Sequence, residues 1–144
     1  MLARQSDRAG KDDAAEAEYE TVFGLAPGFK EGAVDYANFL VKVKKFDQAL
    51  LILERLRDED KFQFEYFLIR GRALMGLGNY GDAIASFLEG NKIYNSDVRL
   101  LNALGYCYSR AGDRLRALET LRASLRLNPN QDEVKKLIAE IEQR

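Results

Sequence analysis

Apolar and polar positions alternate along this chain with the period of amphipathic helices, and the whole pattern repeats at a fixed interval. Four equivalent positions, 34 residues apart, carry alanine: Ala15, Ala49, Ala83 and Ala117. The position four residues after each alanine carries a large apolar side chain: Tyr19, Leu53, Phe87 and Leu121. Glycine stands five residues before three of the alanines, and Lys44 takes its place in the second unit. Apolar residues spaced by three and four form one face of a helix, so the interval predicts a tandem array of helical units.

This period and pattern resemble the tetratricopeptide repeat, in which two helices and a turn form each unit. The most regular match falls in residues 98–130 and consists of Leu104, Gly105, Tyr108, Gly112, Ala117, Leu121, Asn128 and Pro129. The resemblance implies an all-α fold in which antiparallel helix pairs form a right-handed superhelical array, an α-solenoid. Gly71 and Gly105 are interpreted as packing residues that let neighbouring helices approach closely, because no glycine cluster resembles a phosphate-binding loop.

The repeat register divides a single domain, residues 1–144, into five segments: a partial repeat at 1–29, full repeats at 30–63, 64–97 and 98–130, and a C-terminal capping helix at 131–144. In the last segment, apolar side chains recur along one helix face and charged side chains occupy the other, as a terminal unit needs. The apolar set is Val134, Leu137, Ile138 and Ile141. In phase with the later units, the first helix would start before Met1, so we expect the natural chain to extend upstream.

Three departures from the repeat pattern affect the expected packing. Lys44 replaces a turn glycine, so the end of its helix is predicted to be less stable. Arg114 stands where other units carry an aromatic residue, which puts a charge next to a turn. The connection at 57–64 lacks proline and carries two phenylalanines. Either Phe62 and Phe64 pack beneath the loop, or they form an exposed apolar patch.

The residue types needed for most enzyme chemistry are missing. The chain has no histidine and one cysteine, Cys107, which excludes Ser-His and Cys-His nucleophile pairs, a zinc site and an internal disulfide. Cys107 lies on the apolar side of its helix and is interpreted as a small core residue, with a redox or nucleophilic role as the alternative. No enclosed pair of carboxylates and no cofactor-binding motif is recognisable. We therefore expect a protein that is not an enzyme and that binds no cofactor and no metal.

Charge and hydropathy argue against binding to nucleic acid and against insertion into a membrane. The net charge is −1 without a continuous basic stripe, so binding to nucleic acid is not expected. Apolar runs are too short for a transmembrane span, and the first residues lack an apolar core long enough for a signal peptide. The compartment is unknown; a cytoplasmic protein is favoured, with a targeting segment upstream as the alternative.

Residues 98–130 carry six arginines and two acidic residues. This excess of positive charge either steers an acidic ligand toward the repeat or only keeps the helix surface solvated.

In the tetratricopeptide family, the first helices of the pairs line a concave groove that binds peptides. Carried over to this chain, the resemblance places ten residues on the groove: Val34, Asn38, Val41, Leu68, Arg72, Met75, Arg99, Asn102, Tyr106 and Arg110. This mixture of apolar, amide, tyrosine and arginine side chains suits an extended peptide, because tyrosine and arginine are frequent binding anchors. The alternative is a set of solvated helix faces in which Leu68 and Met75 are partly buried. Three charged residues are expected near the groove rim: Glu31, Glu65 and Arg99.

Some members of the family hold the C-terminal carboxylate of a chaperone with a clamp of lysines, asparagines and an arginine. Asn38 matches one clamp position, but three other positions carry Val34, Ile69 and Ala103 instead of polar residues. Chaperone-tail binding is therefore not expected. The leading hypothesis is a non-catalytic scaffold that binds a protein or an extended peptide in its groove. The alternative is a structural element that associates with another copy of itself or docks within a larger protein.

Overall fold

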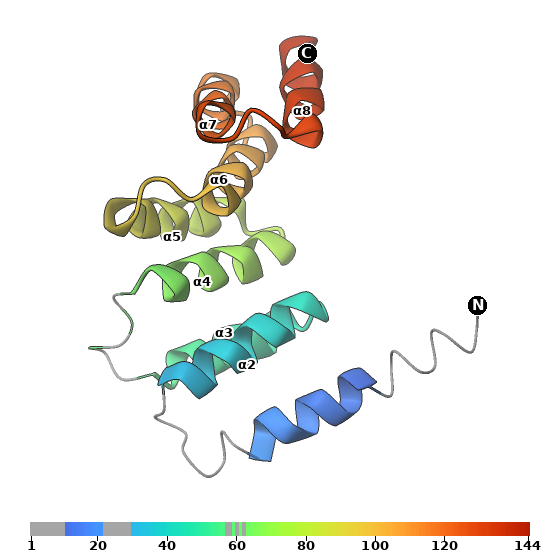
Figure 1. The fold of residues 1–144 in the computed structure, drawn as a ribbon, viewed down its shortest axis with the longest axis vertical. Helices are drawn as coiled ribbons and strands as arrows, with labels where there is room; N and C mark the ends of the chain where they lie inside the picture. Colours follow the sequence, from blue (N-terminus) through green and yellow to red (C-terminus); the bar gives the residue numbers. More distant parts are fainter. Residues whose placement is uncertain (1–10, 22–29, 57–58, 60, 62) are drawn as a thin grey trace, which may run out of the picture. The chain divides into compact units, whose positions relative to one another are not determined.

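The computed structural model describes residues 11–21, 30–56, 59, 61 and 63–144. Most of these residues form α-helices joined by short turns, and no strand occurs among them, which confirms the all-helical prediction (Figure 1). The chain divides into two compact units, Met1–Phe62 and Gln63–Arg144. We call them unit 1 and unit 2. The assignment of all five predicted segments to a single domain stays a prediction.

The described residues of unit 1 form three helical segments: residues 11–21, α2 (Lys30–Lys42) and α3 (Phe46–Glu54). Aromatic rings join the first segment to α2. The ring of Tyr19 stacks in parallel on the ring of Tyr36, with centroids 5.6 Å apart, and its centroid lies 5.3 Å from that of Phe39. Lys45 Nζ forms an ion pair with Glu16 Oε2 at 2.5 Å. The partial first repeat is therefore attached to the first complete helix pair by both apolar and charged contacts.

The turn after α2 contains a residue in the left-handed backbone conformation. Lys44 has a φ of 64°, and its N–H donates to Val41 O at 3.0 Å. The equivalent turn residues of unit 2 are Gly78, with a φ of 79°, and Gly112, with a φ of 85°. Glycine adopts this conformation without the steric cost that a side chain adds. The prediction that Lys44 makes its helix end less favourable therefore has a geometric basis.

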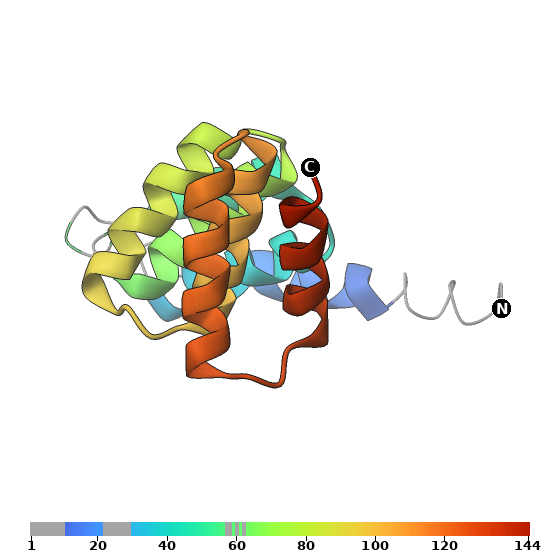
Figure 2. The same cartoon turned by 90° about the horizontal axis from the view of Figure 1, so that it is seen from above.

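Unit 2 contains two helix pairs and one further helix: α4 (Phe64–Gly76), α5 (Tyr80–Ile93), α6 (Val98–Arg110), α7 (Arg114–Leu127) and α8 (Asp132–Glu142). Helices that follow each other in the sequence also pack against each other. Figure 2 shows α7 and α8 side by side, with the short connection between them. Each of these helices lies inside the segment that the 34-residue interval predicts.

Side chains at the helix starts of unit 2 accept hydrogen bonds from the first backbone N–H groups, which otherwise lack partners. Asn79 Oδ1 accepts from the N–H of Asp82 at 3.4 Å, and Asp113 Oδ1 accepts from the N–H of Arg116 at 3.2 Å. Asp97 does the same at the start of α6. These caps explain why three of the helices begin where they do.

Small residues mark the closest contacts within each helix pair of unit 2. Ala83 is fully buried. A Cβ added at Gly105 would lie 2.6 Å from Leu121 Cδ2, and one added at Gly71 would overlap the ring of Phe87. A side chain at either glycine would therefore force two helices apart. The packing role predicted for these glycines is confirmed.

α8 covers the apolar face of α7 at the end of unit 2. Val134, Ile138 and Ile141 form one buried cluster with the inner face of α7, as a capping helix requires. Arg114 Nε donates to Ile141 O at 3.2 Å, and Arg114 Nη2 donates to Glu142 O at 3.1 Å. The guanidinium thus meets the negative C-terminal end of α8. This contact explains a charged residue where other units have an aromatic side chain.

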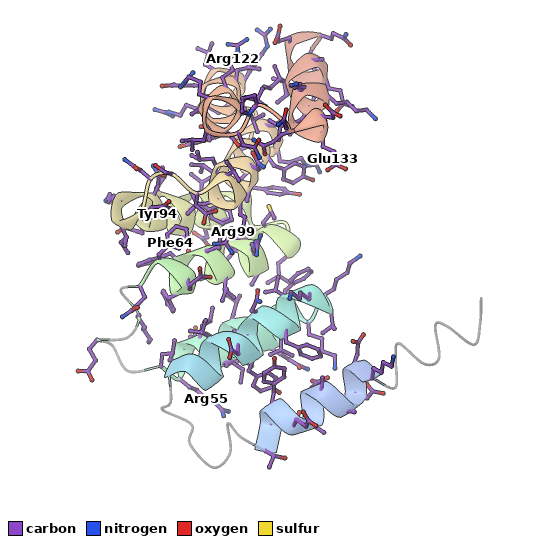
Figure 3. The ribbon with its side chains drawn as sticks, in the orientation of Figure 1. Arg55, Phe64, Tyr94, Arg99, Arg122 and Glu133 are labelled. Carbon is purple, nitrogen blue, oxygen red and sulfur yellow. The ribbon has the colours of Figure 1, made fainter. Side chains whose placement is uncertain are left out.

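The aromatic residue at the start of α4 packs against the segment that follows α5. The ring of Phe64 meets the ring of Tyr94 edge-on, with centroids 5.7 Å apart (Figure 3). Phe64 is only partly exposed, so the packing interpretation holds for this residue. Phe62 lies outside the described residues.

Cys107 is fully buried in α6. Burial raises the pKa of its thiol to about 12, because a thiolate is poorly solvated in an apolar environment. The thiolate is the reactive form of cysteine. The side chain therefore acts as a core residue, as the pattern predicts.

Candidate protein-interaction site

An exposed cluster of two tyrosines and one arginine lies where α6 meets the start of α5. Tyr106 is 39% exposed, and its ring meets the ring of Tyr80 edge-on, with centroids 6.2 Å apart. Arg110 places its guanidinium carbon 5.5 Å from the centroid of the Tyr80 ring. Residues four apart on a helix share one face, which is why Tyr106 and Arg110 both reach Tyr80. We call these three residues the Tyr-Arg cluster.

The Tyr-Arg cluster offers hydrogen-bond donors and an aromatic surface together. Burial raises the pKa of Tyr106, and a side-chain hydrogen bond with Tyr80 raises it further, so the phenol stays neutral at physiological pH. The Arg110 guanidinium lies over the Tyr80 ring and shares a side-chain hydrogen bond with Tyr80. A guanidinium has five N–H donors, so others remain available to a ligand. Arg110 is exposed. The cluster can therefore donate to a carboxylate or to the backbone carbonyls of a bound segment.

Arg99 is held between two carboxylates of unit 2 (labelled in Figure 3). Its Nη2 lies 2.7 Å from Asp97 Oδ2 and 3.3 Å from Glu65 Oε1 on α4. The side-chain hydrogen bond from Arg99 lowers the pKa of Asp97. The ion pair with Glu65 places these two residues side by side on the first helices of consecutive pairs. Because its charge is balanced within the protein, Arg99 attracts an acidic ligand less than its charge alone suggests.

Asn102 has an internal role in unit 2. Its Nδ2 donates to Gln131 Oε1 at 2.8 Å, and its Oδ1 accepts from Ser124 Oγ at 2.6 Å. Gln131 Nε2 in turn donates to Ser124 O at 3.2 Å. The network joins α6 to α7 and to the start of α8. Both ends of the Asn102 amide already have partners, so we do not include it among the residues that contact a ligand.

The α4 residues predicted for the groove differ in exposure. Leu68 is fully buried, so its side chain belongs to the core and does not form an accessible surface. Arg72 and Met75 are partly buried. Burial lowers the pKa of Arg72, and the nearby charge of Arg99 lowers it further. α4 thus contributes Arg72 and Met75 to the accessible face.

The remaining three predicted residues, Val34, Asn38 and Val41, are partly buried on α2. They belong to unit 1, whereas the other seven belong to unit 2. A groove shared by both sets stays a prediction.

Sequence reasoning missed Tyr80 as a site residue. The repeat pattern assigns it to the buried stripe of α5, but its side chain is only partly buried, and its ring contacts both Tyr106 and Arg110. The residue type could have indicated this, because the hydroxyl group of a tyrosine usually contacts solvent or a hydrogen-bond partner.

Family models of the tetratricopeptide repeat match this chain twice, over residues 8–73 and over residues 98–131. Together the two matches cover more than half of the chain, and they include α2, α3, α6 and α7. The chain belongs to the tetratricopeptide repeat family. No curated protein matches its sequence.

Several solved structures share this tetratricopeptide fold. A crystal structure of MamA superposes with a TM-score of 0.84 at 17% identity, over 99% of this chain and 84% of that one. MamA from residue 41 to its end, from Desulfovibrio magneticus RS-1, gives 0.75 at 20% identity, over 88% and 71%. A thermophilic tetratricopeptide protein of Thermus thermophilus gives 0.76 at 19% identity, over 99% and 79%. At these identities the likeness concerns the fold, and it confirms an α-solenoid of tetratricopeptide type.

Tetratricopeptide repeats are in general non-catalytic modules that bind proteins or peptides, and this chain is a protein-interaction scaffold of that class. No helix among the described residues is long and apolar enough to cross a membrane. Residues 11–21, 30–56 and 63–144 also contain no group of three or more His, Cys, Asp or Glu side chains that could hold a metal ion. The Tyr-Arg cluster is a candidate contact surface of unit 2.

Proposed function

We propose that unit 2 binds an extended segment of a partner protein across its first helices, α4 and α6, with the Tyr-Arg cluster as the main contact. The observation that supports the proposal is the exposed ring of Tyr106, which meets the Tyr80 ring edge-on while the Arg110 guanidinium lies over that same Tyr80 ring. Both lie on the face of α6 that the family resemblance assigns to the groove. Tyrosine and arginine carry much of the binding energy at protein interfaces, and side chains that are already ordered lose little entropy on binding.

The chemistry of the cluster favours a segment that carries an acidic residue next to an aromatic or apolar one. Tyrosine neighbours, rather than a carboxylate of unit 2, are the main electrostatic influence on Arg110, so its N–H groups can form a paired contact with a ligand carboxylate. Arg99 already contacts Asp97 and Glu65. The preference for an acidic ligand is therefore assigned to Arg110 and not to Arg99.

The proposed contact surface differs from the ten residues that the sequence places on the groove. In the proposal, Arg72 and Met75 of α4 contact the bound segment next to the Tyr-Arg cluster. Leu68 is a core residue, and Asn102 forms hydrogen bonds within unit 2, so neither contacts the segment. Three further residues remain candidates for contacts made by unit 1: Val34, Asn38 and Val41.

A selection of displayed random peptides tests this proposal. The wild-type protein and the double variant Tyr106→Ala/Arg110→Glu are screened in parallel, and Lys136→Ala on the exposed side of α8 serves as the matched control. We expect peptides with an acidic consensus that are enriched on the wild type and on the control but not on the double variant. Equal enrichment on the double variant, with its helicity unchanged by circular dichroism, contradicts the proposal.

A further inference from the structure

Arg72 lies in the middle of the surface that α4 and α6 form together, which we call the α4–α6 surface. Two contacts hold this surface together. Glu65 of α4 forms an ion pair with Arg99 of α6 at 3.3 Å, and Tyr80, which follows α4 across a short turn, contacts Tyr106 in the second half of α6. Arg72 and Tyr106 each lie seven residues beyond the ion pair on their own helix, which is about 10 Å further along the same face. Arg72 is therefore next to the Tyr-Arg cluster.

The guanidinium of Arg72 has no ion-pair or hydrogen-bond partner in the part of the chain that the structure describes. The two carboxylates whose charge acts on it, Asp97 and Glu65, both contact Arg99 instead. Arg72 is partly buried, and burial lowers its pKa, which the positive charge of Arg99 lowers further. A partly buried cation beside a second cation is stabilised by an anion that contacts it. A carboxylate of a bound segment supplies such an anion.

We propose that the segment bound on the α4–α6 surface carries two acidic side chains, one paired with Arg110 and the other with Arg72, on either side of an apolar side chain that packs against Tyr106. The contact at Arg72 rests on the proposed function, because Tyr106 and Arg110 belong to the Tyr-Arg cluster. It adds a requirement that the cluster alone does not impose, namely a second acidic residue at a fixed distance from the first.

The positions of the two arginines set the spacing of the two acidic residues. Arg110 lies four residues, or about 6 Å, beyond Tyr106 along α6, and the axes of helices in contact, such as α4 and α6, are about 8–10 Å apart. Arg72 and Arg110 are therefore roughly 10–12 Å apart. Side chains at positions i, i+2 and i+4 of an extended chain share one face, and the first and last are about 13 Å apart. The matching motif is Glu-x-Phe-x-Glu, which reads the same in both chain directions.

Titrations with two synthetic peptides test the contact at Arg72. The first peptide has the core Glu-Ser-Phe-Ser-Glu and blocked ends. The control has the core Glu-Ser-Phe-Glu-Ser, which keeps the composition and the charge but turns the second carboxylate to the opposite face. Each peptide is added to millimolar concentration to the full ¹⁵N-labelled chain, and the Nε–H signal of Arg72 and the amide signals of α6 are followed. We expect the first peptide to bind about three- to tenfold more tightly and to be the one that shifts the Arg72 signal.

A charge-removing variant assigns the preference to Arg72. Arg72→Met keeps an apolar side chain that packs like the arginine stem, and Lys136→Met on the exposed side of α8 is the charge-matched control. We expect Arg72→Met to bind the first peptide as weakly as the control peptide and to leave binding of the control peptide unchanged, whereas Lys136→Met alters neither. The proposal is overturned by equal affinities of the two peptides for the wild type, by a preference that persists in Arg72→Met, or by the absence of saturable binding of the first peptide.

The double variant Tyr106→Ala/Arg110→Glu separates this proposal from the proposed function. If the wild type binds both peptides equally and the double variant binds neither, the contact at Arg72 is overturned and the proposed function stands. If the double variant binds both peptides as tightly as the wild type, the Tyr-Arg cluster is not the main contact, and the proposed function is contradicted together with the contact at Arg72.

Discussion

Replacing Lys44 with glycine is expected to stabilise unit 1. Lys44 has a φ of 64°, a conformation that costs a residue with a side chain roughly 1–2 kcal/mol. Glycine removes this cost. It also gives the unfolded chain more conformational freedom, which lowers the free energy of unfolding by roughly 0.5–1 kcal/mol. The difference predicts that Lys44→Gly raises the free energy of unfolding by about 0.5–1 kcal/mol.

Urea denaturation of the full chain, followed by far-ultraviolet circular dichroism, measures this change. Hydrogen exchange of the Lys45 amide, which donates to Leu40 O at 2.8 Å across the same turn, should slow in Lys44→Gly. Lys44→Ala is the matched control, because it removes the charge and keeps the strained φ, so its stability should stay within a few tenths of a kcal/mol of the wild type.

Gly112→Ala provides the reverse experiment in unit 2. Nothing lies within 4 Å of a Cβ added at Gly112, so the cost of the substitution is conformational, and a loss of roughly 1 kcal/mol is expected. Equal changes in the free energy of unfolding for Lys44→Gly and Lys44→Ala, or a lower value for Lys44→Gly, contradict the conformational cost assigned to Lys44.

Three further substitutions test the packing and the caps of unit 2. Gly105→Ala puts a Cβ 2.6 Å from Leu121 and should lower the free energy of unfolding by roughly 1–3 kcal/mol, seen as a lower urea midpoint. Arg114→Ala removes two bonds to the end of α8 and should speed hydrogen exchange in α8 but not in α4. Asp97→Ala removes a helix cap and should cost roughly 1 kcal/mol at neutral pH. Because the folded-state pKa of Asp97 is lowered, this contribution is present above the unfolded carboxyl pKa and is lost as pH falls through the folded value. The urea midpoints of wild type and Asp97→Ala should therefore converge in acid.

The helices of unit 2 follow from the sequence because their determinants are local. Glycines at the turns, capping side chains at the helix starts and apolar residues at three-to-four spacing all act within one or two helical turns. The role of Arg114 could not be derived in this way, because its acceptor Ile141 O is 27 residues away. The network of Asn102 is likewise non-local, since its partners are 22 and 29 residues distant. Contacts of this kind depend on how whole helices pack.

The Tyr-Arg cluster likewise combines a spacing within one helix with a contact between two helices. The repeat register places Tyr106 and Arg110 together because four residues separate them on one helix. Tyr80 belongs to another helix, and its contact with both follows from the packing of α5 on α6.

A partner is proposed to bind at the α4–α6 surface. Isothermal titration of one selected acidic peptide into the wild type and into Arg110→Glu tests this claim. We predict that Arg110→Glu raises the dissociation constant at least about tenfold and that lysine in place of the acidic residue of the peptide restores the affinity. Equal dissociation constants for the two proteins contradict the claim.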